Sequence, residues 1–219
     1  MTHDGEIDRI VYYETMESDL RAGKPLTRTQ RARRDDIITA TIIVLDQEGF
    51  AAASVERIAQ VARATKSTVL YHFDTKDAIY HEVVRILLEQ AQAALTKTRD
   101  PASPAAEQLR TYLDLHLRFI AVHAAHVNAV RQILMNQSAD YQLPDSTTEI
   151  RQILTNGQVF REFGEFDADV MAMVIRSIID GFSAHWGDAA TLDHRIDEIV
   201  ALFARATKPY EPSDSRWDI

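Results

Sequence analysis

Residues 54–73 read Ser-Val-Glu-Arg-Ile-Ala-Gln-Val-Ala-Arg-Ala-Thr-Lys-Ser-Thr-Val-Leu-Tyr-His-Phe and predict two short helices joined by a tight turn. Ser54 is suited to cap the first helix, because its hydroxyl can accept a hydrogen bond from a free amide of the first turn. Thr65 can cap the second helix in the same way. The apolar residues of the first helix then share one face: Val55, Ile58, Ala59 and Ala62.

The second of these helices has a polar face and an apolar face. Its apolar residues are Val69, Leu70 and Phe73. Its polar residues are Lys66, Ser67, Thr68, Tyr71 and His72. A short helix with an inward anchor and outward hydroxyl, amine and imidazole groups has the composition of a DNA recognition helix. The alternative is an ordinary helical hairpin at the edge of a core.

The flanking residues extend the pattern in both directions. The ordered motifs are Gly49-Phe50, Ser54-Val-x-x-Ile-Ala59, Thr65-Lys-x-Thr68, His72-Phe73 and Thr75-Lys-Asp77. With these motifs in this order and spacing, residues 29–79 closely resemble the N-terminal domain of the TetR family of bacterial transcriptional repressors. The resemblance covers about a quarter of the chain at the level of motifs. The remainder resembles the family only in the lengths and order of its helices.

Two positions depart from the family pattern. Arg63 stands where the family usually has glycine, and a left-handed arginine there costs on the order of 1 kcal/mol. Leu70 stands where the family usually has tyrosine, and Tyr71 follows it. Either Tyr71 takes over the corresponding phosphate contact from one residue further round the helix, or the contact is lost.

Composition restricts the class of protein. The chain has 219 residues, of which 46% are hydrophobic and 26% charged, as in soluble globular proteins. No apolar run approaches the ~20 residues of a membrane span, and the N-terminus is acidic and unlike a signal peptide. The absence of cysteine excludes disulfides, thiolate nucleophiles and cysteine-based metal sites. We therefore expect a cytoplasmic protein.

The net charge of −9 is unevenly distributed along the chain. Residues 24–76 carry nine lysines and arginines against six acidic residues, a net charge of +3, so the remainder carries −12. A basic head on an acidic body allows contacts with phosphate while the body stays soluble.

The periodicity of apolar residues predicts an all-α protein with a three-helix head and a helical body. We expect a mobile extension at 1–27, a helix-turn-helix DNA-binding domain at 28–75, a ligand-binding and dimerisation domain at 76–207, and a tail at 208–219. A core face at Ile37, Ala40, Thr41, Val44 and Leu45 defines the first helix of the head, and Gly49 ends it. A long helix from Lys76 to about residue 97 links head and body. Further helices are expected from Pro104 through Leu134, from Thr147 to about Gly157, from Asp167 to Trp186, and from Leu192 to Phe203.

The helix at 167–186 is apolar over a wider arc than one core face requires, which is about three positions in seven. The additional apolar positions predict that this helix packs against a second chain. The alternative is that the helix is completely buried within one chain. The resemblance implies the same surface, since this family dimerises through its last two long helices as a four-helix bundle. The expected interface residues are Val174, Ile178, Gly181, Phe182, Trp186, Ile196, Ile199, Val200 and Phe203.

A two-fold dimer would place two recognition helices in successive major grooves, about 34 Å apart, and would read a near-palindromic operator. We expect Lys66, Ser67, Thr68 and Tyr71 to face the groove, with Lys66 reading guanine. By resemblance, Ser54, His72 and Lys76 hold phosphates. Arg33 or Arg34 adds a phosphate or minor-groove contact.

The resemblance also implies a pocket for a small-molecule effector inside each body. Binding there would tilt the linking helix and release DNA. The candidate lining residues are Tyr112, His116, Phe119, His123, Asn128, Arg131, Met135, Phe160 and Phe163. Arg131 and the histidines would suit an anionic or hydrogen-bonding group on an apolar ligand. The alternative is that this stripe of aromatic residues and methionine is ordinary core.

No metal, cofactor or catalytic activity is predicted. His116, His123 and His126 lie too far apart along a helix to bind one ion without other partners. Nucleophile elbows, His-Glu-x-x-His motifs and glycine-rich phosphate loops do not occur. The sequence thus favours a ligand-responsive transcriptional regulator, a homodimeric repressor. The alternatives are an all-α enzyme or a scaffolding protein with a buried apolar pocket and no DNA binding.

Overall fold

The computed structural model describes residues 26–96, 100, 102–137, 141, 145–185 and 190–209. Within these ranges every regular element is helical, which confirms the predicted all-α class. The predictions for most of the N-terminal extension, for Trp186 and for the end of the tail concern residues outside the described ranges.

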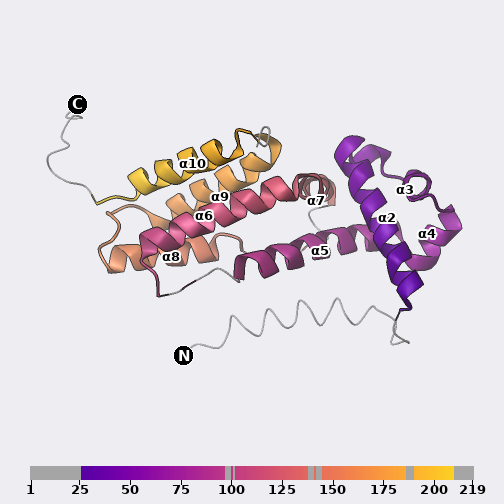
Figure 1. The fold of residues 1–219 in the computed structure, drawn as a ribbon, viewed down its shortest axis with the longest axis horizontal. Coiled ribbons are helices and arrows are strands. Elements are labelled where there is room, and N and C mark those ends of the chain that lie inside the picture. Colours follow the sequence, from indigo (N-terminus) through magenta and orange to yellow (C-terminus); the bar gives the residue numbers. More distant parts are fainter. Residues whose placement is uncertain are drawn as a thin grey trace. The chain divides into compact units, whose positions relative to one another are not determined.

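The helices follow the predicted order (Figure 1). They are α2 (Arg28–Gln47), the short 3-10 turn η1 (Phe50–Ala52), α3 (Val55–Val61), α4 (Lys66–His72), α5 (Lys76–Thr96), α6 (Ala105–Val122), α7 (Ala124–Gln137), α8 (Thr148–Val159), α9 (Ala168–His185) and α10 (Leu192–Ala206).

Helix boundaries follow from local residues. Gly49 ends α2 with φ of 83°, a conformation that residues with a Cβ rarely adopt, and its amide donates to the Val44 carbonyl at 3.1 Å. Pro104 occupies the N-cap of α6, as expected. The predicted continuation through Leu134 is instead two helices, because His123 leaves helical geometry between α6 and α7.

Contacts divide the chain into two units, residues 1–36 and 37–219. Both hydrophobic cores lie within the second unit. Its first core joins the end of α2 to α3, α4, α5 and α7. The fully buried side chains include Ile37, Leu45, Ile58, Tyr80 and Ile133. This core therefore extends from the three-helix head into α5 and α7. The predicted domain boundary at residues 75–76 remains a prediction.

The second core is formed by α6, α8, α9 and α10, which Figure 1 shows side by side. Leu113, Leu117, Ile150, Leu154 and Ile175 are among its fully buried residues. None of the described helices is both long enough and apolar enough to span a bilayer.

Candidate functional site

Helices α3 and α4 begin at the two predicted caps. The Ser54 hydroxyl accepts from the Arg57 amide at 3.1 Å, and the Thr65 hydroxyl accepts from the Thr68 amide at 3.1 Å. Val69 anchors α4 from within, since its side chain is completely buried. Capping and anchoring together fix which face of α4 points outward.

The turn between α3 and α4 is a Schellman motif. The Ala64 amide donates to the Ala59 carbonyl at 2.9 Å, and the Arg63 amide donates to the Gln60 carbonyl at 3.2 Å. Arg63 has φ of 51°, the left-handed conformation that the departure from glycine raised as a possibility. The backbone at Arg63 is therefore strained, because the Cβ crowds the neighbouring carbonyl in this conformation. Glycine at the same position would not be strained.

Arg63→Gly is expected to raise the free energy of unfolding by about 1 kcal/mol, because it removes this strain. Chemical denaturation at constant pH measures the change. Arg110→Gly is the matched control: this exposed arginine lies within α6, where glycine should cost about 1 kcal/mol. A loss of stability for Arg63→Gly would contradict the assignment of strain to this turn.

The outward face of α4 carries the predicted polar groups. The hydroxyls of Ser67 and Thr68 each lie 2.8 Å from the Thr65 hydroxyl. Tyr71 is 73% exposed and packs edge-on against His72, with ring centroids 5.1 Å apart. Lys66 is also exposed, and its ammonium pairs with the Glu56 carboxylate of α3. This face offers hydroxyl, phenol and ammonium groups to a partner.

The other basic residues of the candidate interface also have partners within the chain. The ammonium of Lys76 lies 5.3 Å from the ring centroids of both Phe50 and Tyr80, in cation–π geometry. Arg57, which sequence reasoning missed, donates to both oxygens of Glu48, and these bonds lower the pKa of that carboxyl.

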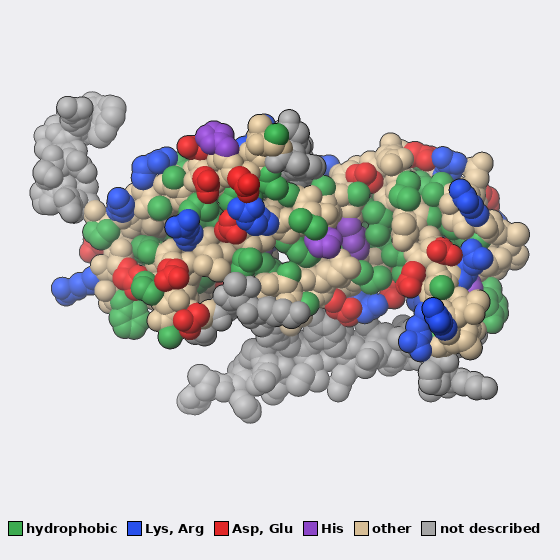
Figure 2. Space-filling view, viewed as in Figure 1, with side chains coloured by type: hydrophobic (Ala, Val, Ile, Leu, Met, Phe, Trp, Pro, Cys, Tyr) green, Lys and Arg blue, Asp and Glu red, His purple; other side chains and the backbone are tan. Residues whose placement is uncertain are grey.

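Arg33 and Arg34 belong to the first unit. Arg33 donates to Asp36 at 3.3 Å, and both arginines are half-buried. On the face that Figure 2 shows, basic side chains lie among acidic ones. Phosphate would therefore have to replace carboxylate partners such as Glu48 and Glu56.

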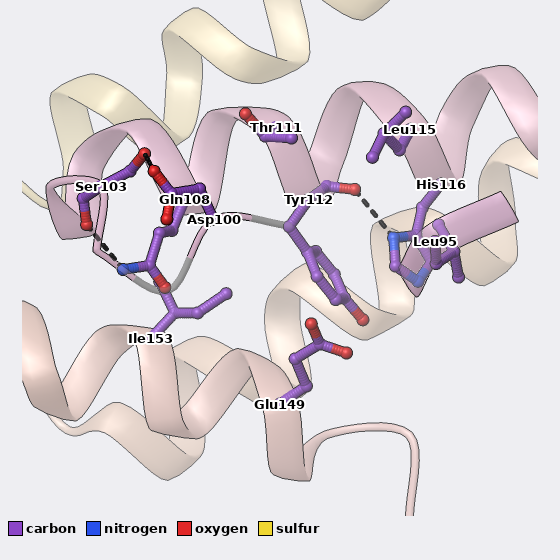
Figure 3. A pocket seen from close by; sticks show the side chains of 10 residues that line it. All are labelled: Leu95, Asp100, Ser103, Gln108, Thr111, Tyr112, Leu115, His116, Glu149 and Ile153. Carbon is purple, nitrogen blue, oxygen red and sulfur yellow. Dashed lines mark hydrogen bonds between the residues drawn. The ribbon is translucent and has the colours of Figure 1, made fainter. Parts of the chain in front are cut away.

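A cavity of about 50 Å³ lies in the body, where α6 meets α8 and the end of α5 (Figure 3). Its lining residues are Leu95, Asp100, Ser103, Gln108, Thr111, Tyr112, Leu115, His116, Glu149 and Ile153. Tyr112 and His116 are the two predicted ligand residues among them. Three more of them, Gln108, Thr111 and Leu115, could have been found from their spacing, because they lie within a helical turn of Tyr112 on α6.

The other seven predicted ligand residues do not line this cavity. Phe119 packs against the first core and stacks on His123, with centroids 4.4 Å apart. Asn128 donates to the Asp46 carboxylate at 2.7 Å and accepts from Arg131 at 2.7 Å, so this pair ties α7 to α2. The remaining three are Met135 and Phe160, each 73% exposed, and Phe163, which is buried in the second core.

Burial shifts the pKa values of two cavity side chains further toward favouring their uncharged forms. It raises the pKa of Tyr112 to about 12 and lowers the pKa of His116 to about 4. The Nδ1 of His116 lies 2.8 Å from the Tyr112 carbonyl. Because a carbonyl only accepts, Nδ1 carries the proton of the neutral ring, and Nε2 is an acceptor.

The predicted interface residues fall into two groups in the single chain. Phe182, Ile196 and Phe203 are buried in the second core, so they pack within their own chain. Val174 and Gly181 are exposed, and Ile178, Ile199 and Val200 are half-buried. The wide apolar arc of α9 thus serves two surfaces. Val170, Met173 and Leu202 are also exposed, although they were not among the expected interface residues.

Histidines take local roles in the described part of the chain. The Nε2 of His126 lies 2.8 Å from the Val83 carbonyl, which joins α7 to α5. Among the described residues, no group of three histidine, aspartate or glutamate side chains is placed to hold a metal ion.

Comparison with known proteins gives three kinds of likeness. Residues 37–83 match the model of the family described as bacterial regulatory proteins, tetR family. The HTH-type transcriptional regulator RutR of Escherichia coli K12 is 32% identical over 91 residues, 42% of each chain. The chain is therefore aligned with less than half the length of this curated relative.

Two solved structures share the fold. A tetR-family regulatory protein from Rhodococcus RHA1 has a TM-score of 0.71 at 18% identity, covering 82% of this chain and 98% of its own. AibR, solved with isovaleryl coenzyme A and operator DNA, has a TM-score of 0.66 at 13% identity, covering 78% of this chain and 97% of its own. Residues 37–83 therefore resemble the TetR family of bacterial regulatory proteins, and the chain as a whole shares the fold of solved tetR-family proteins.

Proposed function

We propose that this protein is a transcriptional regulator that binds operator DNA as a homodimer, represses transcription and is released by a small molecule. One observation carries the proposal: α4 has a buried anchor at Val69 and an exposed outward face with Lys66, Ser67 and Tyr71. The names of the relatives support it, since RutR is an HTH-type transcriptional regulator and AibR was solved with operator DNA.

In this proposal α4 enters the major groove. Lys66 exchanges the Glu56 carboxylate for a guanine edge, and Ser67, Thr68 and Tyr71 contact neighbouring bases or phosphates. Glu56 also acts against non-specific binding, because an unexchanged carboxylate repels phosphate.

Phosphate contacts surround the recognition helix. Ser54, His72 and Lys76 hold the backbone, with Arg33 or Arg34 adding a further contact. Lys76 is held over two aromatic rings, which restricts its ammonium before DNA arrives. Less side-chain entropy is then lost on binding.

Two copies would associate through α9 and α10. Val170, Met173 and Val174 recur on one exposed side of α9, and Leu202 is exposed on α10. Among the described residues, nothing outside its own helix lies within 4 Å of a Cβ added at Gly181, which would allow a second helix to approach closely there. The resulting two-fold axis would set two α4 helices about 34 Å apart on DNA.

The proposed effector site is the cavity between α6 and α8. It lies beside the end of α5, whose other end packs in the first core with α3 and α4. A ligand that moves α5 would therefore shift the position of α4. AibR, solved with isovaleryl coenzyme A, provides a precedent for a small molecule and DNA on this fold.

DNA binding is tested with Lys76→Gln and Lys66→Gln, using fluorescence anisotropy on fragments flanking the protein's own gene across a salt series. Lys76→Gln should weaken binding to every sequence and reduce the salt slope by about one. Lys66→Gln should change which sequence binds best, with about 1–3 kcal/mol of discrimination lost at one base pair.

Lys208→Gln removes an exposed charge from the end of the body and should leave both measurements unchanged. Equal losses on all sequences for both head variants would contradict the separate roles. A folded protein that binds no fragment at low salt, or that is monomeric by sedimentation, would favour the scaffolding or enzyme alternatives.

A further inference from the structure

Arg63 differs from the other basic residues around the recognition helix in having an uncommitted charge. Four lysines and arginines lie between residues 37 and 76. Arg57 and Lys66 each bind a carboxylate, and Lys76 lies over two aromatic rings. Arg63 is exposed, and its side chain has no hydrogen bond, ion pair or ring contact among the described residues. Its guanidinium can therefore bind an anion without first giving up another partner.

The position of Arg63 favours the DNA backbone over the base edges. It lies in the turn between α3 and α4, two residues before the N-cap Thr65 and three before Lys66. In a helix-turn-helix, the first residues of the recognition helix contact bases, and the preceding helix crosses the phosphate backbone. The turn lies between these two parts of the motif. With α4 in the groove, a long side chain that leaves this turn is directed to the phosphates at the groove edge.

The backbone conformation shows that arginine is not at this position for the sake of the turn. With φ of 51°, Arg63 has the left-handed conformation that glycine would adopt without strain. Residues held in such conformations cluster at functional sites. What arginine adds over glycine is a permanent charge and a planar fork of N–H donors, and this fork matches the geometry of phosphate oxygens.

We infer that Arg63 binds a phosphate of the DNA backbone beside the groove that α4 enters. The inference rests on the proposed function and adds a contact that was not among the expected DNA-binding residues. Lys66 and Arg57 must give up carboxylates before they can bind DNA, but Arg63 has no such partner to lose. Because a phosphate contact carries no sequence information, Arg63 adds affinity equally for the operator and for unrelated DNA.

The test is fluorescence anisotropy of the full chain across a salt series, with a fragment flanking its own gene and an unrelated duplex of equal length. Arg63→Gln removes the charge but keeps a side chain on the left-handed backbone. It should weaken binding to both duplexes by about tenfold and reduce the salt slope by about one for each bound head. Arg63→Lys keeps the charge and should retain most of the affinity.

Arg161→Gln is the matched control. Arg161 is also an exposed arginine with a left-handed backbone, at φ of 59°, but it lies in the loop after α8 in the body. Its replacement should leave the affinity and the salt slope unchanged. Arg63→Gly separates binding from stability, because it should bind both duplexes as weakly as Arg63→Gln although its turn is no longer strained.

Several results would overturn the inference. These are an unaltered affinity and salt slope in Arg63→Gln, an equal loss in Arg63→Lys or in Arg161→Gln, and a loss confined to one of the two duplexes, which would indicate a base contact. Wild-type protein that is folded and binds neither duplex rejects the proposed function, and this inference with it. Wild-type binding that Arg63→Gln leaves unaltered rejects this inference alone.

Discussion

Gly157→Ala is expected to lower the free energy of unfolding by about 2 kcal/mol and the melting temperature by about 4–8 °C. A Cβ at this buried position would lie 2.8 Å from the ring Cγ of Phe163, and nearer still to Cδ2 and Cε2. Carbon atoms of neighbouring side chains do not pack so closely, so the ring or α8 would have to move.

The ring cannot move away without breaking other contacts. The Phe163 side chain is 94% buried in the second core, and its centroid lies 6.4 Å from that of Phe166. Its amide and that of Glu162 both donate to the Gly157 carbonyl, at 3.0 and 2.8 Å. The loop after α8 thus fixes the ring over the one position where the helix has no side chain.

Thermal and chemical denaturation measure this effect, with Asn156→Ala as the matched control. Asn156 is exposed on the same helix, so alanine there should change stability by no more than about 0.5 kcal/mol. In Phe163→Leu, which lacks the ring, Gly157→Ala should cost much less. Additive losses in the double variant would show that the ring is not the cause.

The helix-turn-helix was predictable from sequence because local signals determine it. Ser54 and Thr65 cap helices whatever surrounds them, and Gly49 ends α2 through its own backbone conformation. Ile58 on α3 and Val69 on α4 are buried because the helical period places each on the apolar face of its own helix. The conformation and burial of these residues depend only on neighbours within one or two helical turns.

The ion pairs around this motif were not predictable in the same way. Lys66 with Glu56 and Arg57 with Glu48 join residues about ten positions apart, across a turn whose geometry the sequence does not specify. This pairing makes phosphate binding by Lys66 and Arg57 less favourable, because each side chain must first give up a carboxylate partner that the sequence does not reveal.

The cavity proposed as the effector site was predictable only in small part, because it depends on how separate helices meet. Tyr112 and His116 belong to one helical face and were found, but Glu149 comes from α8 and Leu95 from α5. α7, which follows the break at His123, packs in the first core; there Asn128 donates to Asp46, Arg131 donates to Asn128, and neither residue lines the cavity. Periodicity predicts that a residue faces inward, but it does not predict which core it enters.

Lowering the pH from 7 to 5 is expected to remove about 2 kcal/mol of stability through His116 alone. Burial lowers the pKa of this imidazole in the folded chain from 6.5 to about 4. Between these values the unfolded chain binds a proton that the folded chain excludes, so the free energy of unfolding falls as the pH falls. Burial lowers the pKa of His126 too, which adds loss in the same direction.

The contribution of His116 is isolated by comparing the wild-type protein with His116→Gln in urea denaturation at several pH values. Glutamine can still donate to the Tyr112 carbonyl but does not titrate, so carboxylate and His126 effects cancel in the difference. The variant should lose about 2 kcal/mol less than the wild type between pH 7 and pH 5. Below the folded pKa the two curves should run parallel again. Parallel curves throughout that interval would mean that His116 accepts a proton inside the folded chain. Its Nε2 would then be a hydrogen-bond donor in acid and would no longer present a lone pair to the cavity.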